Sequence, residues 1–284
     1  MLISRRSGRL VLVTHPDHAA VAGALAEAWG NSRFAAPARA GAFQVVARRH
    51  DDGWRTLDGE PHHNAEAGRP SHFLEVPLET SAAHYGPGVD GIHRDDAYAG
   101  VLASMHWAGL YSARWGLQPG GPLDLPLTRE VVAVQQRRWS EALGRLWDGG
   151  RPRSEFEAQV WFAYELLQAV DLLSLALCTV DATVPTNPGA DPVLVTATLP
   201  TIDQPPGPRI VPAVPLAAGG ERCDLTVRVT EPEVVTVDPS PLRADVALAI
   251  PVRELPDRRY ASARESAAAY ADAPVGELSC VVST

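Results

Sequence analysis

Residues 166–178 read LLQAVDLLSLALC, a stretch in which the only charged side chain is Asp171. Apolar residues such as Leu167 and Leu172 lie on nearly every face of a helix with this sequence, which predicts a buried helix over 154–177. A buried carboxylate needs a group that compensates its charge. A metal ion is one candidate partner of Asp171, and an arginine or a helix-packing hydrogen bond is the other.

The composition changes sharply after this helix. All seven tryptophans lie at or before Trp161, all nine histidines lie at or before His106, and 15 of the 25 prolines follow residue 183. We therefore expect two parts, a helical domain over 1–182 and a Pro-rich, β-rich region over 183–284.

Periodicity and turn residues predict the individual elements. We expect helices at 16–29, 43–49, 96–115, 128–147 and 262–271, and a short helix that carries His84 and ends at Gly86-Pro87. Alternating or continuous apolar runs predict strands at 9–14, 192–199, 223–230, 233–239, 245–252 and 278–282. The strand at 9–14 is expected to join the C-terminal sheet.

The overall composition excludes several classes of protein. A net charge of −9 argues against nucleic acid or an anionic membrane as partner, because both attract basic surfaces. The chain contains no lysine, which excludes a Walker A loop, Schiff-base chemistry and the usual kinase site. Three cysteines without a CxxC pair argue against a disulfide framework. No segment resembles a signal peptide or a membrane span, so a cytoplasmic location is expected.

Histidines and acids recur inside apolar helices. His106 lies in AGVLASMHWAGLY, and the pair His50-Asp51 follows the apolar stretch FQVVARR. A lone buried histidine is more often a hydrogen-bonded core residue than a ligand, but the tandem pair favours a metal site. Because adjacent helical residues point about 100° apart, His50 and Asp51 reach one metal only near a helix end, unless Asp51 bridges to a second metal.

The order His18, His50-Asp51, His84, His106, Asp171 resembles the six-ligand, two-metal form of the HD-domain metalloenzyme superfamily. The resemblance implies an α+β fold in which an HD-type all-helical bundle precedes a small β-rich C-terminal region. It also implies two divalent metal ions, with iron expected and manganese or zinc as alternatives. His18, His50 and Asp171 would hold one metal, His84 and His106 would hold the other, and Asp51 would bridge them.

The chain also resembles an uncharacterised bacterial family within that superfamily. The stretches that carry this resemblance include THPDHA at 14–19, HDDGW at 50–54, SMHWAGLY at 104–111 and LLQAVDLLSLALC at 166–178. Trp54 stands where a phosphate-contacting lysine is often found, so we place Trp54 and His15 beside Asp51 among the reaction-site residues. His93 is the alternative to His84. His62, His63 and His72 lie in a polar loop and are expected to be solvated or to form a lid.

Three functions fit these residues. The first is a di-iron oxygenase that acts on a small polar organic substrate, favoured because THPDHA resembles the opening of phosphonate-oxidising HD oxygenases. The second is a two-metal phosphohydrolase. The third is a non-catalytic module stabilised by metal.

Overall fold

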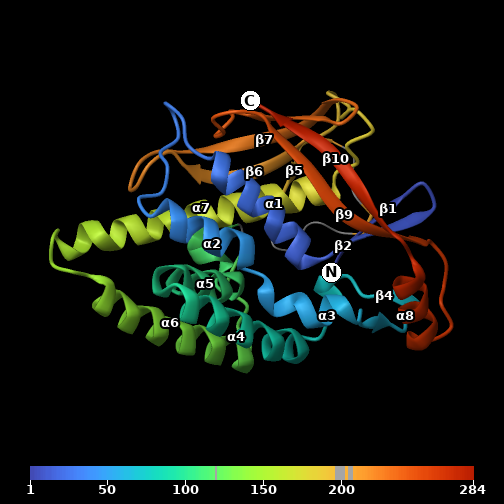
Figure 1. Cartoon of the computed structure of the whole chain (residues 1–284), viewed down its shortest axis with the longest axis horizontal. Helices are drawn as coiled ribbons and strands as arrows, with labels where there is room; N and C mark the ends of the chain where they lie inside the picture. Colours follow the sequence, from blue (N-terminus) through green and yellow to red (C-terminus); the bar gives the residue numbers. More distant parts are fainter. Residues whose placement is uncertain (119, 196–201, 204–206) are drawn as a thin grey trace.

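A curled sheet covers two helices, and further helices pack beneath them (Figure 1). The computed structural model describes residues 1–284 except 119, 196–201 and 204–206. In the described residues the sheet has eight strands in the order β1-β2-β9-β10-β8-β7-β6-β5. The strands are β1 (Leu2–Arg6), β2 (Arg9–Val13), β5 (Val193–Leu194), β6 (Arg209–Pro215), β7 (Arg222–Glu231), β8 (Val234–Asp238), β9 (Val246–Pro256) and β10 (Val275–Ser283).

The strand pairing ties the two ends of the chain together. Strand β2 pairs antiparallel with β9, with Leu10 opposite Leu255, so the N-terminal strand joins the C-terminal sheet as expected. Strands β10 and β8 pair in parallel, as do β5 and β6, and the other neighbours are antiparallel. A separate hairpin of β3 (His63–Asn64) and β4 (Arg69–Pro70) lies beside the C-terminal helix.

The helices form layers below the sheet. Helices α1 and α7 lie against the sheet, and α2, α4, α5 and α6 extend the structure away from it (Figure 1). The helices are α1 (His15–Ala28), α2 (Ala40–Arg49), α3 (Arg55–Gly59), α4 (Leu78–Asp95), α5 (Ala97–Tyr111), α6 (Pro126–Leu146), α7 (Arg153–Thr179) and α8 (Ala263–Asp272). Thr14 caps α1 as predicted, since its side chain accepts a hydrogen bond from the Asp17 amide.

The predicted fold class is wrong. The protein has a mixed α/β structure built on a large curled sheet, not an HD-type helical bundle followed by a small β-rich region. Two N-terminal strands enter the sheet, and the main core contains residues of the helices and of strands β6 to β10 together. Apolar periodicity identified strands and helices but carried no information on how the two would pack. The division at residue 183 stays a prediction.

Three element predictions also need correction. Helix α4 runs through Pro87 to Asp95 instead of ending there, with Tyr85, Val89 and Ile92 buried along it. Helix α5 ends at Tyr111, four residues early, because residues 113–115 adopt left-handed backbone angles. Strands β1 and β6 were not expected, and most of the strand predicted at 192–199 lies outside the described residues.

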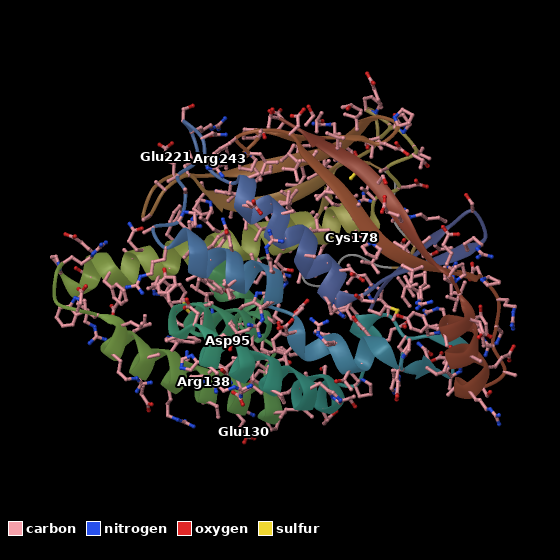
Figure 2. The ribbon with its side chains drawn as sticks, in the orientation of Figure 1. Asp95, Glu130, Arg138, Cys178, Glu221 and Arg243 are labelled. Atoms are coloured by element: carbon pink, nitrogen blue, oxygen red, sulfur yellow. The ribbon has the colours of Figure 1, made fainter. Side chains whose placement is uncertain are left out.

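Helix α7 is the apolar centre of the molecule. It is long and apolar enough to cross a membrane, but 89% of its most apolar 18-residue window is buried inside the protein. Cys178 near its end lies beneath the sheet, whereas Glu130 and Arg138 lie on the outer helical surface (Figure 2). Burial of α7 agrees with the first expectation drawn from its sequence.

Candidate metal centre

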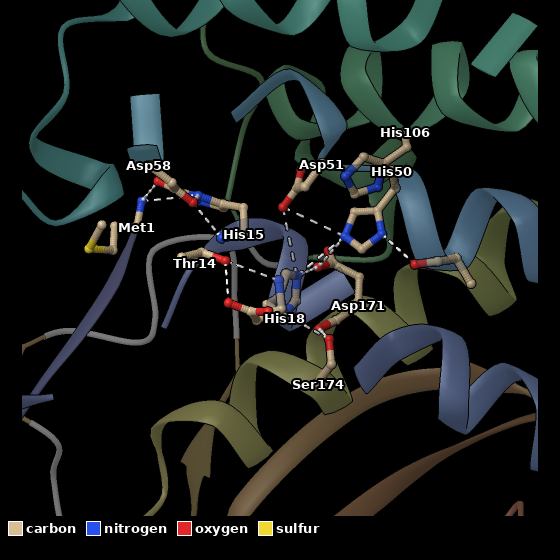
Figure 3. A network of polar contacts seen from close by, with 12 residues as sticks. Met1, Thr14, His15, His18, His50, Asp51, Asp58, His106, Asp171 and Ser174 are labelled. Atoms are coloured by element: carbon tan, nitrogen blue, oxygen red, sulfur yellow. Dashed lines mark hydrogen bonds and ion pairs between the residues drawn. The ribbon is translucent and has the colours of Figure 1, made fainter. Parts of the chain in front are cut away.

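Four of the predicted ligands point at one buried centre (Figure 3). The Nε2 atoms of His18 and His50 lie 3.3 Å apart. Oδ1 of Asp171 lies 3.1 Å from the first nitrogen and 3.4 Å from the second. Oδ2 of Asp51 lies 3.7 Å from each of the two nitrogens. All four side chains are buried.

These separations fit a first-row divalent cation. With ligand bonds of about 2.1 Å, neighbouring donor atoms are about 3.0 Å apart in octahedral and about 3.4 Å apart in tetrahedral coordination. The triangle formed by the His18, His50 and Asp171 donor atoms has sides of 3.1 to 3.4 Å. The geometry of the donor atoms therefore suits one metal ion, and the two imidazoles and carboxylates suit zinc, iron or manganese.

Three helices, α1, α2 and α7, bring these donors together. His50 is the residue that ends α2, and Asp51 has left the helix with φ −108° and ψ 18°. The two adjacent side chains consequently reach the same centre, one of the two arrangements left open by the sequence. His18 comes from α1, and Asp171 comes from the middle of α7.

Two glycines hold the Asp51 turn against α4. A Cβ atom on Gly53 would lie only 2.6 Å from the Cα of Tyr85, and one on Gly88 would overlap the backbone of Gly53. This close approach allows the Tyr85 hydroxyl to donate a 2.8 Å hydrogen bond to Oδ1 of Asp51. Oδ2 of Asp51 is left to face the imidazoles. Tyr85 thus orients a candidate ligand, as partners of metal ligands commonly do.

The two imidazoles also have fixed orientations. Nδ1 of His50 lies 2.9 Å from the carbonyl oxygen of Ala47, and Nδ1 of His18 lies 2.9 Å from Oγ of Ser174. Burial disfavours the charged form of His50, but the carboxylates of Asp51 and Asp171 outweigh it and raise its pKa to about 9. A cation would displace the proton on Nε2 of His50, because a ligating imidazole must be neutral.

Arg114 is a member of the centre that sequence reasoning missed. It is 1% exposed, and its guanidinium donates a 2.8 Å hydrogen bond to Oδ2 of Asp171. Burial opposes ionisation of Asp171, but Arg114 first and then the two imidazoles hold the pKa of this carboxyl well below its usual range. The arginine partner that the sequence left open is therefore present, beside the candidate metal ligands.

A strained turn points Arg114 inward. Ala113, Arg114 and Trp115 have φ of 49°, 49° and 57°, a left-handed conformation that costs about 1–2 kcal/mol per non-glycine residue. The sequence SARWG at 112–116 gave no signal of this turn. Strain of this kind is retained where the surrounding structure enforces it, and functional sites are the commonest location.

His106 lies at the edge of the same cluster. One of its ring nitrogens lies within 4.8 Å of donor atoms of His50 and Asp171, and its other contacts include the Gln168 amide, 3.0 Å from Nδ1. Burial, the main cause, lowers the pKa of His106 to about 3, so the ring is neutral.

His84 is placed elsewhere. Its Nδ1 lies 2.9 Å from the Thr80 carbonyl within α4, and it belongs to neither of the metal-type groups found among the described residues. The alternative, His93, packs against Gly100 of α5 and is in neither group as well. The structure thus gathers five of the six predicted ligands and leaves His84 apart.

His15 and Trp54 lie on the other side of the centre. Their rings stack at 4.2 Å with an interplanar angle of 14°. Nδ1 of His15 lies 2.9 Å from Oδ2 of Asp58 and 3.0 Å from the Met1 nitrogen (Figure 3). Burial first, then the charge of the Met1 nitrogen, lowers the pKa of His15 despite the opposing effect of Asp58. His15 is consequently a buried, neutral imidazole with a carboxylate partner.

A cavity of about 70 Å³ opens onto the centre. Its walls combine apolar side chains with a few polar groups, and its lining consists of His15, His18, Asp51, Trp54, Phe73, His106, Leu110, Arg114, Asp171 and Leu175. The space suits a cation with water or with one small group of a substrate. His72, expected to be solvated or to form a lid, is 2% exposed and packs against Phe73, so it is not solvated.

Fold and site together define an α/β protein with a buried histidine–aspartate centre of metal-ligand type. Residues 1–257 match the family described as protein of unknown function DUF3891, and the chain belongs to this family. Comparisons with curated proteins and with solved structures gave no significant match. Membership of the HD-domain superfamily stays a prediction.

Proposed function

We propose that the protein is a metal-dependent hydrolase with one divalent cation at the histidine–aspartate centre, acting on a small anionic substrate such as a phosphoester. The observation that carries the proposal is the triangle of donor atoms from His18, His50 and Asp171, with sides of 3.1 to 3.4 Å. A cation there would polarise a substrate oxygen and lower the pKa of a coordinated water.

Charge at the cavity favours an anionic substrate. The carboxylates of Asp51 and Asp171 balance a dication, and the guanidinium of Arg114 is then an additional positive charge in the cavity lining. Such a site attracts anions, and guanidinium groups bind phosphate and carboxylate well. The small volume limits the bound part of the substrate to one compact group.

We assign His15 the role of general base, which takes the proton from the attacking water. His15 lines the cavity, and its Nδ1 lies 2.9 Å from Oδ2 of Asp58. The Met1 nitrogen, 3.0 Å from this Nδ1, is paired with Oδ1 of Asp58 over 2.7 Å. With Nδ1–H donating to Asp58, Nε2 is the ring atom for the reaction. An imidazole oriented by a carboxylate is a common general base. Trp54 holds the ring in place by stacking at 4.2 Å.

The di-iron oxygenase is the second candidate. The apolar wall formed by Trp54, Phe73, Leu110 and Leu175 supports it, since a small organic substrate suits such a wall. Both this reaction and a two-metal phosphohydrolase would need a second cation, for which His84 would have to join His106. A metal-stabilised module without turnover is the third candidate.

The test combines metal analysis with two assays. Protein purified without added metal, then loaded with zinc, manganese or iron, is assayed without oxygen for phosphate release from p-nitrophenyl phosphate. We expect one metal per chain and turnover that His50→Gln abolishes and the control His93→Gln preserves. Oxygen uptake with two irons per chain and no anaerobic hydrolysis would favour the oxygenase. Absence of bound metal would refute all three candidates, and bound metal without either reaction would favour the metal-stabilised module.

A further inference from the structure

The three imidazoles of the centre differ in what their Nδ1 atoms contact. Nδ1 of His50 faces a carbonyl oxygen, which only accepts hydrogen bonds, so this nitrogen carries a proton. Oγ of Ser174 donates its own proton to the carbonyl of Asp171 at 2.8 Å, and therefore accepts from Nδ1 of His18. In both rings Nε2 is the nitrogen free to bind a metal, and it is Nε2 that faces the donor triangle.

His106 is held in the opposite way. The amide of Gln168 lies between Arg114 and His106, and its Oε1 accepts from the guanidinium. Arginine has only donors, which fixes the orientation of this amide. Nε2 of Gln168 must then donate to Nδ1 of His106 over 3.0 Å. Since Nδ1 accepts this hydrogen bond, a neutral His106 carries its proton on Nε2.

We infer that His106 is a hydrogen-bond donor to the substrate and not a metal ligand, an inference that rests on the proposed function. An imidazole whose Nε2 is protonated has no lone pair there for a metal, and its Nδ1 is occupied by Gln168. Ligating histidines usually donate their other N–H to an acceptor, as His18 and His50 do and His106 does not. His106 lines the cavity, where its N–H would bind a substrate oxygen.

Arg114 and Gln168 are the positioning residues for this donor. The left-handed turn at Arg114 directs the guanidinium toward Gln168 and Asp171 at the same time. Through Asp171 it contacts a metal ligand, and through Gln168 it sets the tautomer of His106. One arginine thereby separates a metal-binding side of the centre from a substrate-binding side.

The first test measures the tautomer directly. Protein labelled with ¹⁵N-histidine is examined by long-range ¹H–¹⁵N correlation, with His106→Gln used to assign the signal. We expect a neutral ring protonated on Nε2 in the metal-free and the zinc-loaded protein. A ring protonated on Nδ1, or a zinc-induced shift of Nε2 typical of a ligand, would overturn the inference.

The second test uses matched variants. His106→Gln should bind zinc with an affinity within about threefold of the parent, whereas His18→Gln and His50→Gln should each weaken zinc at least about 100-fold. Gln168→Glu keeps the contact with Arg114 but offers only acceptors, so it should move the His106 proton to Nδ1. Equal loss of zinc in all three histidine variants, or an unchanged tautomer in Gln168→Glu, would refute the assignment. Absence of hydrolysis alone would refute the proposed function but not the tautomer.

Discussion

Replacing Arg114 by methionine should destabilise the metal-free protein much more than the metal-loaded protein. The side chains of Arg114 and Asp171 are 2% and 5% exposed, and their charges are joined over 2.8 Å. Removing one partner of a buried ion pair costs about 3–5 kcal/mol, because the other charge is left uncompensated. Methionine has a similar apolar stem and the same strain in the left-handed backbone conformation. The measured difference in stability therefore reflects mainly the loss of the guanidinium charge.

The expected loss can be expressed as a melting temperature. An unfolding entropy of about 2.1 cal/mol/K per residue gives about 0.6 kcal/mol/K for the whole chain of 284 residues. The loss therefore corresponds to a fall in Tm of about 5–8 °C. We expect the smaller fall in Tm when His50 is protonated, because its positive charge then partly compensates the negative charge of Asp171. Bound zinc supplies the missing positive charge, so the difference in Tm should shrink when zinc is present.

The assay is thermal unfolding with chelator and with zinc, for the parent, Arg114→Met and the control Arg129→Met. Arg129 forms an ion pair with Asp124 on the surface, and its loss should change little. A metal-free Arg114→Met protein that melts within about 2 °C of the parent would show that Asp171 does not depend on Arg114. An equal loss with and without zinc would show that the cation does not bind next to Asp171.

Three further predictions concern other parts of the structure. Gly109→Ala should lower the free energy of unfolding in urea by about 1–3 kcal/mol, because its Cβ would overlap the Tyr164 hydroxyl. Adding Tyr164→Phe should recover part of this loss, and no recovery would contradict the contact. Burial lowers the pKa of His72 to about 3, so the unfolded chain takes up a proton that the folded chain does not, and stability should fall as pH drops from about 6.5 toward 3. His72→Gln should flatten this dependence, and an unchanged slope would exclude His72 as its source. His84→Ala should leave the metal content of the purified protein unchanged, and a fall from two equivalents to one would restore the six-ligand prediction.

Local sequence patterns were sufficient for many of the elements. The apolar period of α7 and the Thr14 cap of α1 lie within one or two turns of chain, and both are found as expected. Pro87 misled the prediction, because its local cost is offset by packing of Tyr85, Val89 and Ile92 that the sequence does not display. The clustering of His18, His50, Asp51, His106 and Asp171 agrees with the expectation that metal-type side chains in apolar helices converge.

The sequence by itself determined which segments are helical or extended and which polar side chains had to find partners in the interior. Those properties depend on side-chain periodicity and on the cost of burying charge, and both can be read from residues that are close together in the sequence. Only the tertiary structure decided that β2 would pair with β9, that Arg114 would reach Asp171 across 57 positions, and that His84 would belong to neither metal-type group of the described residues. Such contacts join residues that are remote in the chain, and their geometry follows from how the layers pack.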